Sequence, residues 1–282
     1  MKIKNLPVVL LFVITFLPAK ESMPWGDKGH RLIARKAFEC LPKEMFKFNS
    51  CQAYVVEHSV DPDYRKKKGD NEYPRHFIDI DYYPEFRSGK MIENLDSLER
   101  SYGDSIVTLQ GVLPWTTQST LSALTQAFKE YNKEKILLYA SDLAHYVADG
   151  FQPLHASLNY NGQLSSQKGI HSRYESKILE KYEDDILRRV KTDEGYYIND
   201  IHNYIFDYVT SSNIYADIVF DADRDSYKNS NENYNDEYYR LFWFRTQYLT
   251  IGQISSAART LASLYYTAWI NAGKPPFEGN AQ

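Results

Sequence analysis

A short stretch in the middle of this 282-residue chain holds five residues of types that bind metal ions: His145, Asp149, His155, His171 and Glu175. The first two are four residues apart, and so are the last two. If each of these pairs lies on a helix, its two side chains face the same side of that helix, one turn apart. Two such pairs with a third histidine between them can enclose more than one metal ion.

The other histidines are of two kinds. A single histidine on a helix is more often a core or surface residue than a ligand, and we interpret His58 and His202 in this way. His30 and His76 instead lie close to acidic or tryptophan residues. Imidazole together with carboxylate suits zinc. The chain has neither a CxxC pair nor an HExxH motif, so we expect neither a cysteine-type structural zinc site nor a metalloprotease.

The composition is that of a folded chain without a strong charge bias. Hydrophobic residues make up 43%, the net charge is −4, and the length fits one large domain. No repeat or linker divides the chain. There is no long basic run, so a broad surface for duplex nucleic acid is not expected, whereas a local channel for a short strand is compatible with the sequence.

The N-terminus has the pattern of a secretory signal. Met1–Lys20 contains two early lysines, and its apolar run Pro7–Leu17 is shorter than the roughly 20 residues that span a bilayer. We therefore expect a secreted or periplasmic protein, with an uncleaved anchor as the alternative. Cys40 and Cys51 could form one disulfide in an oxidising compartment or remain two buried thiols.

Helices must position most of these residues. Apolar residues recur at helical spacing over Lys135–Ala148, which carries His145, and Gly150 and Pro153 are expected to end that helix. His30 is expected near the start of another helix. The same periodicity predicts a helix that starts near residues 116–119, and helices over 122–131, 172–190, 204–220 and 238–271. The expected fold is a single, mainly α-helical domain.

The connecting segments carry further expectations. Phe77–Tyr82 alternates apolar and polar residues, which predicts a short extended segment. Pro62 favours extended or turn backbone around Asp61. Residues 159–169 are rich in Asn, Gly, Ser and Gln and are expected to form a loop, and the polar residues 221–235 are expected to lie on the surface.

Four motifs resemble the zinc-dependent phospholipase C and S1/P1 nuclease superfamily: WGDKGH, HFID, HYVADGFQPLH and HSRYE. They occur in the same order as in the family, and the third is the most specific. The resemblance implies an all-α domain of the phospholipase C/P1 nuclease type, with a metal site in a cleft between helices. It also implies three zinc ions and hydrolysis of phosphodiesters. Residues 1–24 would be a signal peptide with a possible short prosegment, and residues 25–282 the phosphodiesterase domain.

The resemblance also assigns ligands to the three zinc ions. It implies a first zinc held by Asp61, His76, His145 and Asp149, a second held by His155, His171 and Glu175, and a third held by Trp25, His30 and the bridging Asp149. Asp63 competes with Asp61 for its place, and we prefer Asp61 because it directly follows an apolar run. Trp25 would bind through its amine and carbonyl, which requires the mature chain to start at that residue.

The reaction implied is attack of a metal-bridged hydroxide on phosphorus, since zinc lowers the pKa of bound water from near 16 to about 7. Asp61 would orient the water or accept its proton, and Arg65 would stabilise the transition state. Phe77 and Asp79 match residues with which the nuclease branch binds a base. Glu175, in contrast, matches the phospholipase branch.

The short loop between His155 and His171 also matches the phospholipase branch. We therefore prefer a phospholipase C-like enzyme that acts on phospholipid. The alternative is a nuclease that acts on single-stranded DNA or RNA, and a third reading is a non-catalytic, zinc-stabilised binding domain. No stable protein partner is evident, and a monomer is expected.

Overall fold

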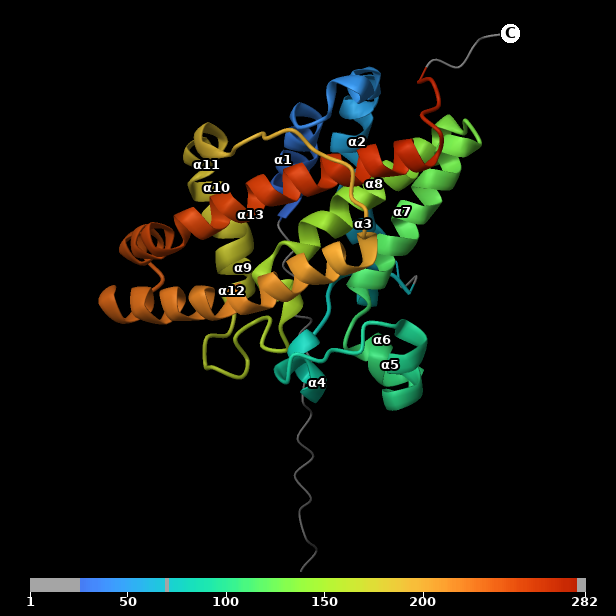
Figure 1. Cartoon of the computed structure of the whole chain (residues 1–282). Helices are drawn as coiled ribbons and strands as arrows, with labels where there is room; N and C mark the ends of the chain where they lie inside the picture. The colour runs from blue at the N-terminus through green and yellow to red at the C-terminus, as the bar shows by residue number, and fades with distance from the viewer. Residues whose placement is uncertain (1–25, 69–70, 278–282) are drawn as a thin grey trace, which may run out of the picture.

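The computed structural model describes residues 26–68 and 71–277, and these residues form helices and loops without a β-strand (Figure 1). The α-helices are α1 (Gly26–Glu39), α2 (Gln52–His58), α3 (Asp61–Lys66), α4 (Pro84–Arg87), α5 (Leu95–Tyr102), α6 (Asp104–Leu109), α7 (Leu113–Lys129), α8 (Lys133–Gly150), α9 (Ile170–Ser172), α10 (Ile178–Lys181), α11 (Glu183–Arg189), α12 (Ile201–Asn229) and α13 (Asp236–Asn271). Short 3-10 segments are η1 (Lys43–Cys51), η2 (Tyr73–His76), η3 (Ile80–Tyr82) and η4 (Pro153–Ala156), and a π-helical turn, η5 (Arg173–Lys177), joins α9 to α10. The expectation of an all-α fold is confirmed.

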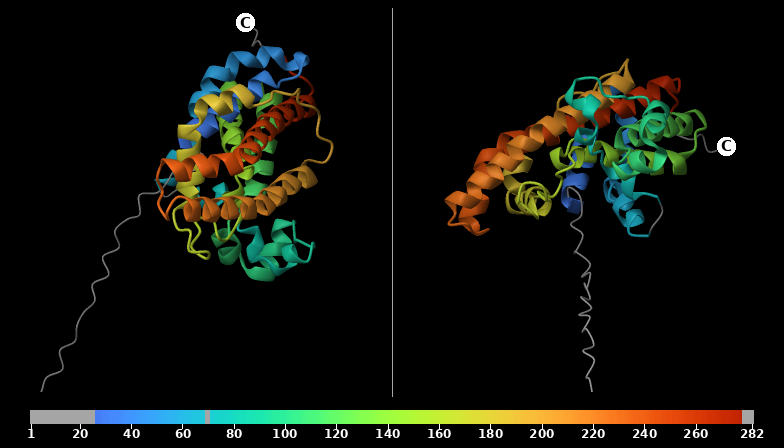
Figure 2. Two further views of the ribbon diagram at one scale, coloured as in Figure 1. Left: turned by 90° about the vertical axis from the view of Figure 1, so that its left-hand side faces the viewer. Right: turned by 90° about the horizontal axis from the view of Figure 1, so that it is seen from below.

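Helix α8 lies at the centre of the fold, in contact with α7, α2, α1 and α13 (Figures 1 and 2). The side chain of Asn132 accepts a hydrogen bond from the amide of Lys135 and so caps the start of α8. The helix ends at Gly150 as expected, where a Cβ atom would lie only 2.5 Å from the Tyr208 ring of α12. Every residue from 140 to 150 is buried. Polar residues in this half of α8 therefore need partners inside the protein.

Helices α12 and α13 form a long antiparallel pair that lies across α8 and the ends of α7 (Figures 1 and 2). Helix α13 matches the helix expected over 238–271, with Asn235 as its N-cap. Its buried side includes Ile254, Leu261 and Tyr265, and the Tyr265 hydroxyl donates to the carbonyl of Ala140 in α8. These contacts hold the two helices over the central helix.

The extended segment expected at Phe77–Tyr82 is absent, because η2 and η3 flank only a short irregular stretch. The amides of this stretch bond to loops: Ile78 donates to the carbonyl of His155, and Asp79 donates to that of Gln110. Gly111 has a φ of +86°, and a Cβ there would lie 2.2 Å from the carbonyl oxygen of Phe77. Only glycine allows this approach.

Three other segments depart from the sequence expectations. Asp61 and Pro62 form the first turn of α3 rather than an extended segment, since proline is tolerated at that position. Helix α7 begins at Leu113, before the expected start, because Pro114 is likewise tolerated in the first turn of a helix. The expected helix over 172–190 is divided into the π turn, α10 and α11.

Residues 221–235 are only partly a surface segment. Helix α12 continues through Asn229, and Asp223 and Ser226 are buried. The loop expected over 159–169 is confirmed. Cys40 is buried and Cys51 is half-buried, and both are free thiols.

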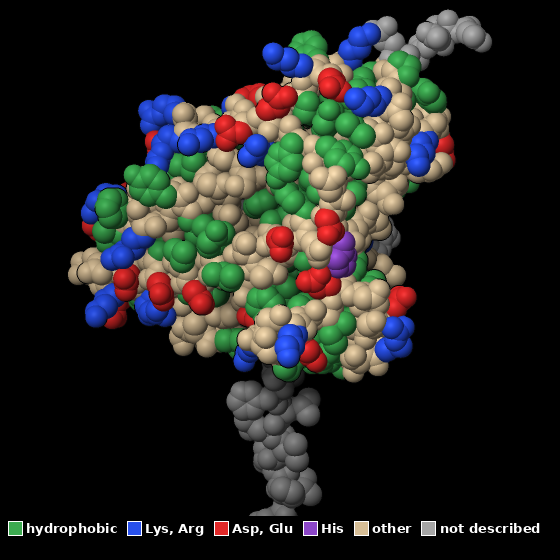
Figure 3. Space-filling model, viewed as in Figure 1, with side chains coloured by type: hydrophobic (Ala, Val, Ile, Leu, Met, Phe, Trp, Pro, Cys, Tyr) green, Lys and Arg blue, Asp and Glu red, His purple; other side chains and the backbone are tan. Residues whose placement is uncertain are grey.

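The expected signal sequence, the boundary at residue 24 and Trp25 lie outside the described residues. Within residues 26–68 and 71–277, no helix combines the length and apolar character needed to cross a membrane. On the face shown in Figure 3, acidic and basic side chains are interspersed, with no broad basic area.

Candidate metal centre

The structure brings eight acidic and histidine side chains into three groups that could hold metal ions. In each group, one ligand atom from each residue lies within 4.8 Å of the others. The groups are His30, His145 and Asp149; Asp63, His76 and His145; and His155, His171 and Glu175. Since His145 belongs to two groups, the sites adjoin one another.

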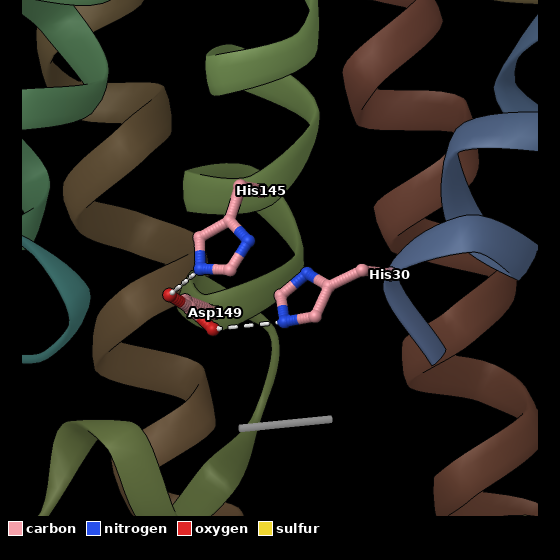
Figure 4. A group of neighbouring side chains, drawn as sticks. All are labelled: His30, His145 and Asp149. Atoms are coloured by element: carbon pink, nitrogen blue, oxygen red, sulfur yellow. Dashed lines mark ion pairs between the residues drawn. The ribbon is translucent and has the colours of Figure 1, made fainter. Parts of the chain in front are cut away.

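The first group joins α1 to α8 (Figure 4). Asp149 Oδ2 lies 3.2 Å from His145 Nε2, one turn earlier in α8, as the spacing predicts. Its other oxygen, Oδ1, lies 3.6 Å from His30 Nε2. The rings of His30 and His145 stack with their centroids 3.9 Å apart. One carboxylate therefore faces two imidazoles, as a bridging ligand would.

The second group adds a histidine from η2 and an acid from α3. His76 Nδ1 lies 2.9 Å from His145 Nε2 and 3.0 Å from Asp149 Oδ2. Asp63 Oδ1 lies 3.7 Å from His76 Nδ1 and 3.8 Å from His145 Nε2. The ligand atoms thus surround one small volume beside Asp149.

The third group comes from η4, α9 and the π turn. His171 Nε2 lies 2.5 Å from Glu175 Oε2, and His155 Nε2 lies 3.8 Å from Glu175 Oε1. His155 Nδ1 is 3.4 Å from Asp149 Oδ1, which links this group to the first. The expected pairing of His171 with Glu175 is present, although the backbone between them is not a regular α-helix. π turns of this kind are frequent at functional sites.

Three of the histidines hydrogen-bond to backbone carbonyls through the nitrogen that faces away from their group. The Nδ1 atoms of His145, His155 and His171 lie 2.8, 2.7 and 3.2 Å from the carbonyl oxygens of Ser59, His76 and Tyr160. A carbonyl only accepts, so each Nδ1 carries a proton, and Nε2 is the nitrogen that faces the group. This arrangement is common for metal-binding histidines.

Several ligand atoms in these groups are buried without a hydrogen-bond partner among the described residues. They are His30 Nε2, Asp63 Oδ2, Asp149 Oδ1, His155 Nε2 and Glu175 Oε1. Leaving buried polar atoms unpaired costs on the order of 1–3 kcal/mol each, and more when they are charged. Divalent cations would satisfy the two imidazole nitrogens and the oxygens of Asp149 and Glu175, so the residues present fit a metal cluster.

The protonation states of the buried groups agree with this use. Burial lowers the pKa of His30 to about 3 and that of His76 to about 4, so both rings are neutral at pH 7. Burial opposes ionisation of Asp149, but His145 and His155 hold the pKa of its carboxyl well below the ordinary value. Burial alone would lower the pKa of His155, yet Asp149 and Glu175 raise it to about 9. A bound metal would therefore displace a proton from that ring.

The structure places Asp63, and not Asp61, among the candidate metal ligands. The Asp61 side chain is 42% exposed and pairs with His58 at 2.8 Å, whereas that of Asp63 is 1% exposed. Both residues lie in α3, where positions two apart point to nearly opposite sides. The preceding apolar run fixed the depth of the segment but not the direction of either side chain.

Arg65 also lies apart from the ligand atoms. Its Nη2 atom is 3.0 Å from Asp142 Oδ1, and its Nε atom is 3.2 Å from Glu72 Oε2. The cation that contacts the metal centre is Lys66, with its Nζ atom 2.9 Å from Asp63 Oδ1. Sequence reasoning missed Lys66, and the three-residue spacing from Asp63 was the signal that could have identified it.

Phe77 and Asp79 lie beside the centre, on the stretch that bonds to the His155 carbonyl. Phe77 is half-buried and packs edge-on against the exposed Tyr73, with centroids 5.3 Å apart. Asp79 is buried, and this burial together with the nearby Asp81 raises its pKa to about 7. Trp25 lies outside the described residues, but α1 begins directly after it. A pocket lined by Gly26, Asp27, Lys28, Glu175, Ser176, Leu179 and Glu180 adjoins that end of α1.

Comparison of the chain with models of known protein families found no match, and a search of curated protein sequences found no significant relative.

Proposed function

We propose that the chain is a secreted, zinc-dependent phosphodiester hydrolase of the phospholipase C and S1/P1 nuclease superfamily. The observation that carries the proposal is the set of three adjoining buried ligand groups that share His145 and meet at Asp149. Histidine and carboxylate donors without cysteine suit zinc. When bound, zinc would lower the pKa of a water molecule and offset negative charge on a phosphoryl group.

The residues that would hold the metals follow from the groups. His76, His145, Asp149 and Asp63 would hold one zinc, and His155, His171 and Glu175 a second. His30 and Asp149 would contribute to a third, together with Trp25.

The chain's own residues would assist the reaction through charge and proton transfer. Asp63 Oδ2 has no partner among the described residues and can accept a proton from an attacking water. Burial opposes ionisation of Asp63, but His145 and then Lys66, which contacts the other oxygen of Asp63, lower the pKa of that carboxyl.

The preferred substrate is a phospholipid, on the resemblance of Glu175 and of the short 159–169 loop to the phospholipase branch. A specific observation favours the alternative, a nuclease for single strands. Tyr73, three residues before the candidate ligand His76, is 55% exposed and forms an aromatic pair with Phe77, the residue directly after His76. Aromatic side chains of this kind stack on nucleic acid bases.

Removal of a shared ligand tests the proposed activity. We expect His145→Ala and Asp149→Ala to abolish phosphodiester hydrolysis and to lower bound zinc, since each residue contacts more than one group. His202→Gln is the matched control, because His202 lies on the surface against Glu93 and Gln118. Full activity in either ligand variant would refute the proposal.

Assay of one preparation on phosphatidylcholine and on single-stranded DNA separates the two substrates. Phe77→Ala should reduce only the cleavage of DNA, if DNA is the substrate. Hydrolysis of neither substrate by a protein that carries zinc would leave the third interpretation, a zinc-stabilised binding domain.

A further inference from the structure

His76 differs from the other histidines of the metal centre in the nitrogen that it presents to the ligand atoms. His145, His155 and His171 use Nε2 and hold Nδ1 against a carbonyl. In His76, Nδ1 faces Asp149 and His145, and Nε2 points the opposite way. A neutral imidazole that binds a metal through Nδ1 carries its proton on Nε2. That proton needs an acceptor inside the protein.

The nearest carboxylate to this nitrogen belongs to Glu72, one turn earlier in the chain. Glu72 Oε1 lies 3.7 Å from His76 Nε2, and this nitrogen is buried without a hydrogen-bond partner among the described residues. The Glu72 side chain is only 5% exposed. A small rotation of the imidazole or of the carboxylate would close the distance to a hydrogen bond.

A network of hydrogen bonds fixes Glu72 in this place. Tyr146 donates a hydrogen bond to Oε1, while Arg65 and Arg75 donate to Oε2 at 3.2 and 3.1 Å. The guanidinium of Arg75 also lies over the Tyr146 ring, 4.9 Å from its centroid. Arg65 then pairs with Asp142, which lies one turn before Tyr146 in α8. The network therefore connects α3, η2 and α8, the elements that supply Asp63, His76 and His145.

We propose that Glu72 is a positioning residue of the metal centre: it accepts the Nε2 proton of His76 and so directs Nδ1 of that ring to the metal. Carboxylates that accept from the second nitrogen of a ligand histidine fix its tautomer and raise its basicity. Among the described ligand histidines, His76 is the one whose partner is a side chain, so substitution can remove it. The network also gives Arg65 a structural role in holding Glu72.

The inference rests on the proposed zinc site but not on the proposed reaction, so its test measures zinc binding. The full chain, as wild type, Glu72→Gln and Asp142→Asn, is stripped of metal and titrated with Zn²⁺ against a competing chelator. In Glu72→Gln the amide can turn its oxygen to the two arginines or to His76, but not to both. Asp142→Asn is the matched control, since it removes a buried charge from the far end of the same network without touching His76.

We expect Glu72→Gln to lower the affinity for one of the zinc ions by about 10- to 100-fold. The affinities for the other zinc ions should change by less than about threefold. In Asp142→Asn, the affinity for every zinc ion should stay within about threefold of the wild-type value. Nitrogen-15 spectra of the histidine rings in the zinc-loaded protein provide a second readout. The Nε2–H signal of His76 should shift in Glu72→Gln and stay in place in Asp142→Asn.

Equal zinc affinities in wild type and Glu72→Gln would overturn the inference, and so would an equal loss in both variants. A parallel assay of phosphodiester hydrolysis separates this outcome from failure of the proposed function. A wild-type protein that binds zinc as expected but hydrolyses no phosphodiester would contradict the function alone. A wild-type protein that binds no zinc would contradict both.

Discussion

Asp61 and Asp63 show how sharply two neighbouring carboxylates can differ within one helix. Asp63 faces His76 and His145 from a buried position, while Asp61 pairs with His58 near solvent. A buried ligand supports the charge of a metal, whereas an exposed ion pair contributes little to stability.

The two aspartates form a matched pair of substitutions. Asp63→Asn should lower phosphodiester hydrolysis on the order of 100-fold and weaken one zinc equivalent, because loss of a metal ligand removes several kcal/mol of charge stabilisation. Asp61→Asn should stay within about twofold of wild type in both measurements, as expected for an exposed pair. Steady-state rates and bound zinc check the prediction, and equal effects of the two changes would contradict it.

Asp79 gives a prediction about pH. Its folded pKa is about 7, against an ordinary value of 3.8, because burial and the nearby Asp81 disfavour the charged form. The folded state therefore holds a proton that the unfolded state releases between these two values. The contribution of Asp79 to the free energy of unfolding is therefore complete below about pH 4 and is lost as the pH rises through 7.

Asparagine at this position cannot ionise, so Asp79→Asn should gain stability relative to wild type as the pH rises. The gain between pH 4 and pH 8 is expected to be roughly 2–4 kcal/mol. Urea unfolding at several pH values, at constant metal load, measures it. Asp81→Asn should itself reduce the pH dependence, because the nearby Asp81 charge helps to raise the pKa of Asp79. A constant difference between Asp79→Asn and wild type over this range would contradict the assigned pKa.

At the scale of elements, the π turn that carries Glu175 is anchored by its first residue. Arg173 is buried and contacts Asp223 in α12 at 2.9 Å and Tyr234 through a cation–π contact at 4.1 Å. It also donates to the carbonyls of Gln167 and Lys168, in the loop that leads to His171. One side chain thus ties the loop and the π turn to the α12–α13 pair.

Removal of the charge that balances Arg173 should therefore destabilise the fold. We expect Asp223→Asn to lower the free energy of unfolding by about 3 kcal/mol, since it leaves a buried guanidinium without its partner. Asp221→Asn, in the same helix, breaks an exposed pair with Arg224 and should change stability by less than about 0.5 kcal/mol. Chemical denaturation measures the free energy of unfolding of both variants. A similar loss in both would contradict a larger stabilising contribution from the buried Arg173–Asp223 pair.

At the scale of the whole molecule, the candidate metal centre joins distant parts of the chain. Its candidate ligands come from the central helix α8 and from α1, α3, η2, η4, α9 and the π turn. Without metal, buried carboxylates and imidazoles in these elements lack partners. Metal binding should therefore contribute to the stability of the entire domain.

A chelator should lower the melting temperature of the protein, and added Zn²⁺ should restore it. Free zinc at a thousand times its dissociation constant adds about 4 kcal/mol for each site. Calorimetry of the metal-free and reconstituted protein measures the difference. Mg²⁺, which prefers oxygen ligands, is the control and should not restore the loss. An unchanged melting temperature after complete removal of zinc would contradict a structural contribution from the metal centre.

The sequence by itself determined what depends on local periodicity. The helical spacing of apolar residues predicted the all-α class and placed α8 and α13, and the four-residue spacing paired His145 with Asp149. These features follow from the geometry of one helix, in which residues four apart share a face.

Only the tertiary structure decided which of two carboxylates faces the centre and which cation lies beside it. Asp63 rather than Asp61, and Lys66 rather than Arg65, point to the ligand atoms because of how α3 rests on α8. The first residue of the π turn at 173–177, Arg173, likewise bonds to a distant partner, Asp223 in α12. The physical reason is the same in each case. Contacts between residues far apart in the chain determine the direction of a side chain, and the local sequence pattern carries no information about those contacts.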